Sequence, residues 1–184
     1  INTAHELGHK KSRLERNLAT SVLAMGAYGH FAIDHNRGHH RWVATPEDCA
    51  SSRMGENLYV FALRELPGAF RRAWFLETGR LQRHEKSAWS WENEILRAGL
   101  LTVVVSVGLL AAFGVVMIPY LALTYSIGAF HLTMANYVEH YGLLRQKRPN
   151  GLYERCQPHH SWNSNHIVSN WATYHLQRHS DHHA

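Results

Sequence analysis

The sequence predicts an all-α protein, an integral-membrane helical bundle, and three observations lead to this prediction. No charged residue occurs from Ala98 to Phe130, which is too long a stretch for one bilayer crossing. The segment from Arg53 to Glu85 mixes apolar and basic residues at helical spacing. The chain also has 16 histidines, many of them in tight clusters outside the apolar stretch. We therefore expect membrane helices with a metal site on their cytoplasmic face.

The uncharged stretch predicts a transmembrane hairpin. One helix over these residues would run roughly 50 Å, whereas the hydrocarbon core of a bilayer is about 30 Å thick. We expect a turn near Ile118 and Pro119, with spans over about 98–117 and 119–138. Pro119 suits the first turn of the returning helix. A hairpin buried in a soluble protein is the alternative.

Two further helices are expected before the hairpin. Residues from Leu14 to Ile33 are mostly apolar and predict a helix packed against other membrane helices. The segment from Arg53 to Glu85 predicts an amphipathic helix, broken near Pro67 and lying in the membrane interface with a basic polar face. A soluble helix packed on a core would show the same pattern.

The formal charge of +5 is explained by basic residues beside the predicted hairpin. They precede it, follow it and flank the first histidine cluster: Arg83, Lys86, Arg97, Arg145, Lys147, Arg148, Arg155, Lys10, Lys11, Arg13 and Arg16. The positive-inside rule then places both hairpin ends and the histidines in the cytoplasm. Nucleic acid is not expected as a partner, because no basic stripe is interleaved with aromatic residues.

The first two histidine boxes have the spacing of metal ligands on a helix. His5 and His9 stand at i and i+4, so both imidazoles can reach one metal, although HExxH alone also describes zinc proteases. His35 and His39 repeat that spacing. His40 points about 100° away from His39, so we expect it to reach a second metal.

The third box adds His179, His182 and His183, which would share one helical face. Eight histidines exceed what one four-coordinate metal can use, so two metals are the simplest inference. Imidazole ligands admit iron, zinc, copper or nickel. Cys49 and Cys156 form no CxxC, which argues against a disulfide framework or a thiolate zinc site.

Other polar residues near the boxes are candidate ligands or candidate partners of ligands. His140, in Asn136–Leu143, is a ninth candidate ligand, although spacing alone also fits an interfacial residue. Metal-bound histidines commonly donate their second N–H group to a carboxylate. We expect such a role for four carboxylates, which would otherwise be solvated surface charge: Glu6, Asp34, Glu139 and Asp181. The chain starts and stops close to its outermost histidine boxes, so we expect an internal fragment of a longer protein.

Four segments of the chain resemble the integral-membrane alkane 1-monooxygenases of bacteria, also called alkane hydroxylases. They are the segments 5–10, 34–40, 136–143 and 176–184, which together extend from one end of the chain to the other. The family usually has Glu in place of Asp34. Membrane fatty-acid desaturases usually have two residues before the paired histidines of the second box, and this chain has three. Xylene monooxygenases are nearer relatives and stay open as an alternative.

The resemblance implies terminal hydroxylation of n-alkanes to 1-alkanols at a non-haem di-iron site in the bacterial inner membrane. It implies O2 as co-substrate and electrons from NAD(P)H through rubredoxin reductase and rubredoxin. All nine histidines would bind iron, and no catalytic group beyond these ligands is expected. Arg145, Lys147 and Arg148 are candidates for docking the acidic carrier. Tyr125, Phe130 and Leu132 are candidates for lining a substrate channel.

Two other functions stay possible at this stage. A related histidine-box oxygenase or desaturase, acting on xylene or on fatty acids, would use the same boxes. A metal transporter fits less well, because transporters place their ligands near the middle of the membrane. Here only His131 lies inside the apolar run.

Overall fold

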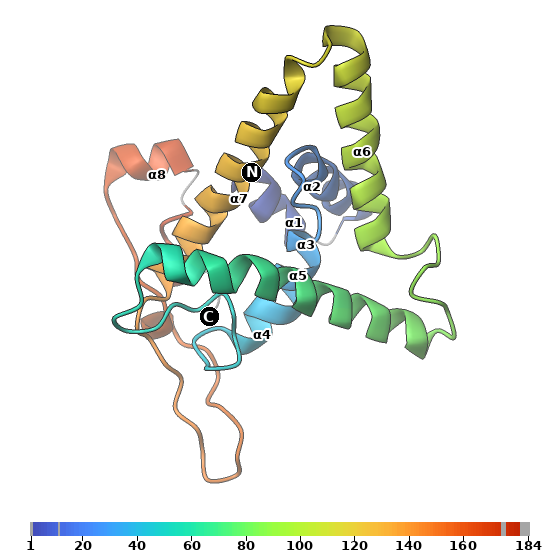
Figure 1. Cartoon of the computed structure of the whole chain (residues 1–184). Coiled ribbons are helices and arrows are strands. Elements are labelled where there is room, and N and C mark those ends of the chain that lie inside the picture. Colours follow the sequence, from blue (N-terminus) through green and yellow to red (C-terminus); the bar gives the residue numbers. More distant parts are fainter. Residues whose placement is uncertain (1, 11, 174–175, 181–184) are drawn as a thin grey trace.

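The computed structural model describes residues 2–10, 12–173 and 176–180 (Figure 1). Its helices are α1 (Asn2–Gly8), α2 (Arg13–Met25), α3 (Phe31–Asp34), α4 (His40–Trp42), α5 (Leu58–Arg83), α6 (Glu94–Phe113), α7 (Met117–Glu139) and α8 (Ile167–Thr173). A π-helix, η1 (His35–His39), joins α3 to α4, and a 3-10 helix, η2 (Pro158–His160), follows α7. The only β-structure in the described residues is two isolated bridges. The all-α prediction is therefore confirmed for this part of the chain.

Helices α6 and α7 form the hairpin arm of the molecule, and they splay apart from their connecting turn with α1 and α2 between them (Figure 1). The turn lies at residues 114–116, slightly earlier than predicted. Gly114 ends α6 there because its φ of +78° is easily reached only by glycine. Pro119 falls in the first turn of α7, as the sequence suggested.

The hairpin carries its apolar side chains on the outside. Val103, Val107 and Ile127 are each more than half exposed, and α6 is the one helix of the described residues that is long and apolar enough to cross a membrane. Between the two helices, the hydroxyls of Ser106 and Tyr125 share a hydrogen bond of 2.7 Å. The polar groups thus pair inside while the apolar groups face outward, an arrangement that suits lipid rather than water.

Helix α5 crosses the base of the hairpin as one continuous helix (Figure 1). The predicted break near Pro67 is therefore wrong. Pro67 removes one backbone N–H donor but does not end the helix. The next residue, Gly68, lies against Cys49. A Cβ added to Gly68 would lie 2.8 Å from the Cys49 Cβ atom. The Pro-Gly pair marks the place where the loop at 43–57 packs on α5.

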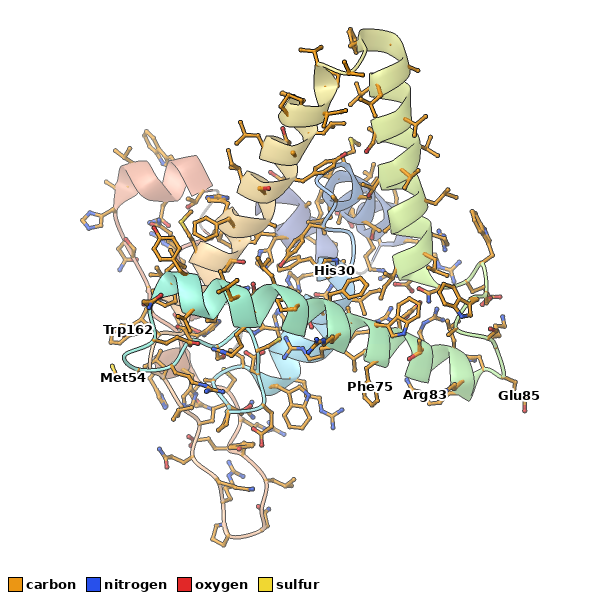
Figure 2. All side chains as sticks on the ribbon, viewed as in Figure 1. His30, Met54, Phe75, Arg83, Glu85 and Trp162 are labelled. Carbon is orange, nitrogen blue, oxygen red and sulfur yellow. The ribbon has the colours of Figure 1, made fainter. Side chains whose placement is uncertain are left out.

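The polar face of α5 also differs from the expected basic face of an interfacial amphipathic helix. Arg72 and Arg80 form ion pairs with carboxylates that are almost fully buried, and Arg64 pairs with the largely buried Glu56. Buried carboxylates are costly without such partners, so these arginines turn inward. Large apolar side chains such as Tyr59, Leu63 and Phe75 are exposed instead. Figure 2 shows Phe75 projecting from α5.

The predicted helix from Leu14 to Ile33 is divided into α2 and α3. A turn at 26–30 separates them, and Ala27 adopts a φ of +55° in it. The turn folds α3 back so that Tyr28 and Phe31 join the buried core formed with Leu23 of α2 and Leu132 of α7. Leu132, a predicted channel residue, is thus part of this core. The core holds α1, which carries His5, and α3, which leads directly into the second histidine box, against the hairpin.

Candidate metal centre

The first histidine box lies on α1 and faces the second box. The ring centroids of His5 and His9 are 5.2 Å apart, and Nε2 of His5 lies 2.6 Å from Nε2 of His35. These three residues offer imidazole nitrogens that all lie within 4.8 Å of one another. The Asn36 amide donates to the Gly8 carbonyl at 3.2 Å and ties the end of α1 to the second box.

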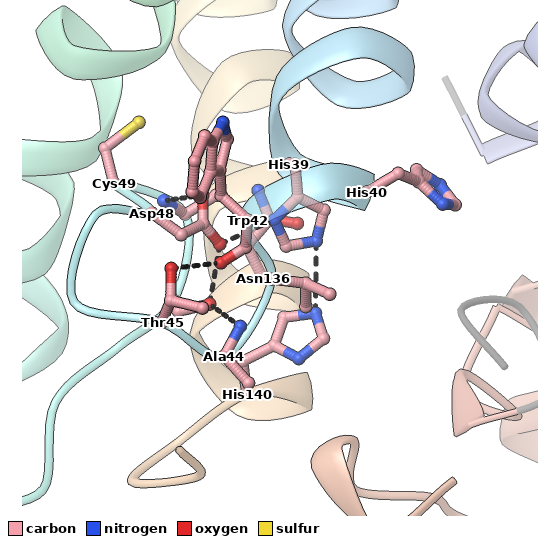
Figure 3. A network of polar contacts seen from close by, with 12 residues as sticks. His39, His40, Trp42, Ala44, Thr45, Asp48, Cys49, Asn136 and His140 are labelled. Atoms are coloured by element: carbon pink, nitrogen blue, oxygen red, sulfur yellow. Dashed lines mark hydrogen bonds and ion pairs between the residues drawn. The ribbon is translucent and has the colours of Figure 1, made fainter. Parts of the chain in front are cut away.

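The second box forms a π-helix, so its histidines are distributed between the two clusters differently from the prediction. In a π-helix the repeat is i to i+5 rather than i to i+4. Nε2 of His40 accordingly lies 3.2 Å from Nε2 of His35, and its ring is 4.7 Å from that of His9. His39 points away from His40, toward His140 (Figure 3). We call His5, His9, His35 and His40 the first cluster.

His39 belongs to a second cluster, built from three distant segments. It meets His140, which follows α7, and His179 of the third box, and the nitrogens of all three lie within 4.8 Å of one another. The Nε2 atoms of His39 and His140 are 3.2 Å apart (Figure 3). All three residues are at most 2% exposed. We call them the second cluster; His182 and His183 lie outside the described residues.

Each member of the second cluster has an oxygen partner on its other side. Nδ1 of His39 donates to the Asp48 carboxylate at 2.8 Å, and Nδ1 of His140 donates to the carbonyl of His160 at 3.2 Å. The Glu139 carboxylate lies 3.3 Å from Nδ1 of His179. Such contacts fix the tautomer and leave Nε2 facing the cluster.

The four predicted carboxylates have different outcomes. Glu139 lies beside a histidine, whereas the hydrogen bonds of Asp34 go to Arg72. The side chain of Glu6 and all of Asp181 lie outside the described residues. The sequence did not indicate Asp48, because it sits in a loop without a neighbouring histidine. A Thr-Pro-Glu-Asp turn just after the second box is its only signal.

One arginine links the two carboxylates near the second box. Arg72 donates to both oxygens of Asp34, at 2.6 and 2.9 Å, and to Asp48 at 2.6 Å. It reaches them across Gly38, where an added Cβ would lie 2.6 Å from the Arg72 Nε atom. The second box therefore needs glycine at this position. Sequence spacing could not reveal this contact, because Arg72 comes from α5.

Burial and the charged partners set the protonation of the site. Burial lowers the pKa of His140 to about 3 and holds the pKa of His35 well below its ordinary value. Burial alone would raise the pKa of Asp48, but His39 and Arg72 lower it below its usual range. The neutral imidazoles of His35 and His140 and the ionised carboxylate of Asp48 are thus favoured, which is the state that suits binding of a metal cation.

These donors fit transition-metal ions. Each cluster offers at least three converging imidazole nitrogens, and imidazole suits iron, zinc, copper and nickel. A third group, formed by Glu154, His159 and His160, fits less well. Nδ1 of His160 accepts the N–H of Gln157 at 2.9 Å, so Nε2 must carry the proton in the neutral ring.

The helical fold and its two histidine clusters define a histidine-box protein. The model of the fatty acid desaturase family matches residues 1–184, and the chain belongs to that family. More particularly, it is a homologue of alkane 1-monooxygenases. It is 60% identical, over all 184 residues, to alkane 1-monooxygenase 1 of Alcanivorax borkumensis and to an alkane 1-monooxygenase of Pseudomonas putida.

A more distant relative is the xylene/toluene monooxygenase hydroxylase component XylM of Pseudomonas putida. It is 30% identical over 186 aligned residues, which include the whole chain and 48% of XylM. The chain spans about half the length of the curated relatives that it matches, 46% for the two alkane 1-monooxygenases. The resemblance noted in the sequence is confirmed.

Proposed function

We propose that the full-length protein hydroxylates n-alkanes at the terminal carbon, consuming O2, two electrons and two protons to give a 1-alkanol and water. One observation carries the proposal: two imidazole clusters, the second of them almost fully buried, lie side by side, with the ring centroids of His35 and His39 only 5.3 Å apart. The names of the relatives that share 60% identity support the alkane as substrate. A lone metal site would not need the second cluster.

We assign two iron ions to these clusters. The first cluster would hold one ion and the second cluster the other, with His182 and His183 completing the set of nine ligands. Bound iron would supply the redox chemistry that activates O2, which no protein side chain can perform alone. Zinc, which has no redox chemistry, would not serve.

The protein's own residues would orient the ligands and keep the site dry. Asp48, Glu139 and the carbonyl of His160 hold the three imidazoles of the second cluster from behind. Because the second cluster is almost fully buried, bulk water is excluded from it. Tyr125 and Phe130 have ordinary packing partners in Ser106 and Tyr59, so ordinary helix packing accounts for them as well as a channel would.

We further propose a multi-pass protein of the bacterial inner membrane, with α6 and α7 as spans and the clusters on the cytoplasmic side. Rubredoxin, reduced by its reductase, would deliver the electrons. Of the predicted docking residues, Arg145 donates to the carbonyls of Val43 and Glu154 and is largely engaged. The exposed Lys147 and Arg148 remain as candidates.

Product analysis tests this function directly. The full-length protein, expressed with rubredoxin and its reductase, is given octane to hexadecane under 18O2, and 1-alkanols carrying 18O are expected. An alkene product would indicate a desaturase. Oxidation of xylene in a parallel reaction, with no alkane oxidised, would indicate the other oxygenase class. Metal analysis and Mössbauer spectroscopy should find two coupled iron ions per chain, and a single zinc ion would contradict the proposal.

A further inference from the structure

Helix α8 lies on a loop whose two ends are joined next to the third histidine box. The N–H of Ser164 donates to the carbonyl of Gln177, and the N–H of Ser180 donates to the Asn163 side chain, both at 2.9 Å. His179, a member of the second cluster, lies just before Ser180. The loop with α8 therefore projects from the paired segments 163–164 and 177–180. We call these paired segments the strap, and they position His179.

The polarity of α8 is the reverse of that of a helix on a soluble protein. Asn170 is 2% exposed, and its amide donates to the carbonyls of Ser164 and His166 at 2.9 Å each. Ile167, Val168 and Trp171 are instead 67%, 78% and 72% exposed. An outward face of large apolar side chains marks a contact with another apolar phase.

Charge and position identify that phase as lipid. Between Arg155 and Arg178 the sequence contains no Asp, Glu, Lys or Arg, but it contains Trp162 and Trp171. Tryptophan is enriched where membrane meets water. In Figure 1, α8 lies on the same side of α5 as the apolar hairpin. The apolar face of α8 is thus found on the side of α5 where α6 and α7 expose their apolar side chains.

We propose that α8 lies in the membrane interface with Ile167, Val168 and Trp171 in contact with lipid, and that this contact steadies the strap carrying His179. The proposal rests on the membrane placement of α6 and α7 given above. A helix of this kind binds through its buried apolar area rather than by spanning the bilayer. It would make the position of the third histidine box depend on the membrane.

Nitroxide labels in the full-length protein, with the native cysteines replaced and the protein in phospholipid nanodiscs, test the lipid contact. Labels at Val168→Cys and Trp171→Cys should collide several times more often with O2, which partitions into lipid, than with a water-soluble nickel chelate. Val107→Cys on α6 is the lipid reference. Leu152→Cys, on the loop that projects away from the hairpin, is the aqueous reference and should show the opposite ratio.

Each other outcome overturns the proposal in a different way. Labels on α8 that meet the nickel chelate would place the helix in water. Labels protected from both reagents would show that protein, either the rest of the chain or a second copy, covers α8. If the reference label at Val107 also fails to meet O2, the proposed placement of α6 and α7 in the membrane is wrong. The labelling measurement does not depend on catalytic activity.

The effect on the strap needs a second measurement. The variant Ile167→Ser/Val168→Ser/Trp171→Ser, in the same nanodiscs, should lose about half of the bound metal, since only the second cluster contains His179. The matched variant Leu144→Ser/Leu152→Ser changes exposed residues away from α8 and should retain the metal. Full retention by the α8 variant would show that lipid contact does not support the strap.

Discussion

The two histidine clusters share one π-helix but are assembled by different kinds of contact. The first cluster joins α1 to the second box, and its His5–His35 contact spans 30 positions of the sequence. The second cluster joins three remote segments, and its His39–His140 contact spans 101 positions. The first cluster therefore depends on nearby helices, whereas the second depends on how the hairpin and the third box fold against the second box.

The surroundings of the clusters differ as well. The ring of Phe31 stacks on His35, with centroids 4.9 Å apart, so an aromatic contact supports the first cluster. The second cluster is backed by Asp48, Glu139 and a backbone carbonyl. Changes of charge should therefore act mainly on the second cluster. Four substitutions test or sharpen this difference.

His140→Ala should have the largest effect. It removes a proposed iron ligand of the second cluster that stands at the end of α7, so we expect hydroxylation to fall below detection and bound iron to drop from two ions toward one. The protein should still insert in the membrane. His84→Ala changes an exposed histidine at the end of α5 and should be nearly silent. Equal, mild losses with iron retained would show that His140 is only an interfacial residue.

Arg72→Gln should come next, because it leaves Asp34 and Asp48 buried without their cation. Removing one partner of a buried ion pair typically costs about 3–5 kcal/mol. Thermal unfolding of the variant in nanodiscs measures this loss. Arg71→Gln, at the exposed neighbouring position, is the matched control. Arg72→Lys restores the charge but cannot reproduce the forked contact with both carboxylates, so partial rescue is expected.

Asp48→Asn should weaken metal binding at the second cluster and leave the first cluster unchanged. The asparagine amide is nearly the same size as the carboxylate, but it brings no negative charge to the hydrogen bond with Nδ1 of His39. The His39 imidazole is therefore held less firmly in its orientation. Losses of such partners typically reduce metal affinity or activity about 10-fold to 100-fold. Iron release to a chelator should be faster from one of the two sites only. Glu47→Gln, at the exposed neighbour, should match the unmodified protein, and equal release from both sites would contradict the comparison.

The sequence predicted that the box histidines gather, that the apolar stretch forms a helical hairpin and that the fold is all-α. These features depend on local spacing and composition. It did not predict the π-helix, since i to i+4 spacing assumes an ordinary α-helix. As a result, His39 and His40 were assigned to the wrong sides. Asp48 and Arg72 were missed for a different reason: their roles come from contacts between segments distant in sequence. The continuity of α5 through Pro67 is likewise decided by packing against the loop with Cys49.

The smallest expected effect concerns His30, which lies outside both clusters and reports on the scaffold. Burial lowers its pKa from an ordinary value near 6.5 to about 4. The unfolded chain therefore binds a proton between these values more readily than the folded protein does, and stability falls as the pH drops through this window. Going from pH 8 to pH 6 should cost about 1 kcal/mol through this residue. Nε2 of His30 has no hydrogen-bond partner among the described residues, and its ring packs against Tyr28 and Phe70.

His30→Phe should remove this contribution while keeping an aromatic ring in place. Unfolding of the metal-loaded protein, followed at pH 8 and pH 6, should show a decrease in stability that is smaller in the variant by about 1 kcal/mol. Iron content should stay at two ions per chain, because neither cluster includes His30. An unchanged pH dependence would mean that His30 does not titrate in this range. A loss of iron would mean that the scaffold and the clusters are more tightly coupled than their separate contacts suggest.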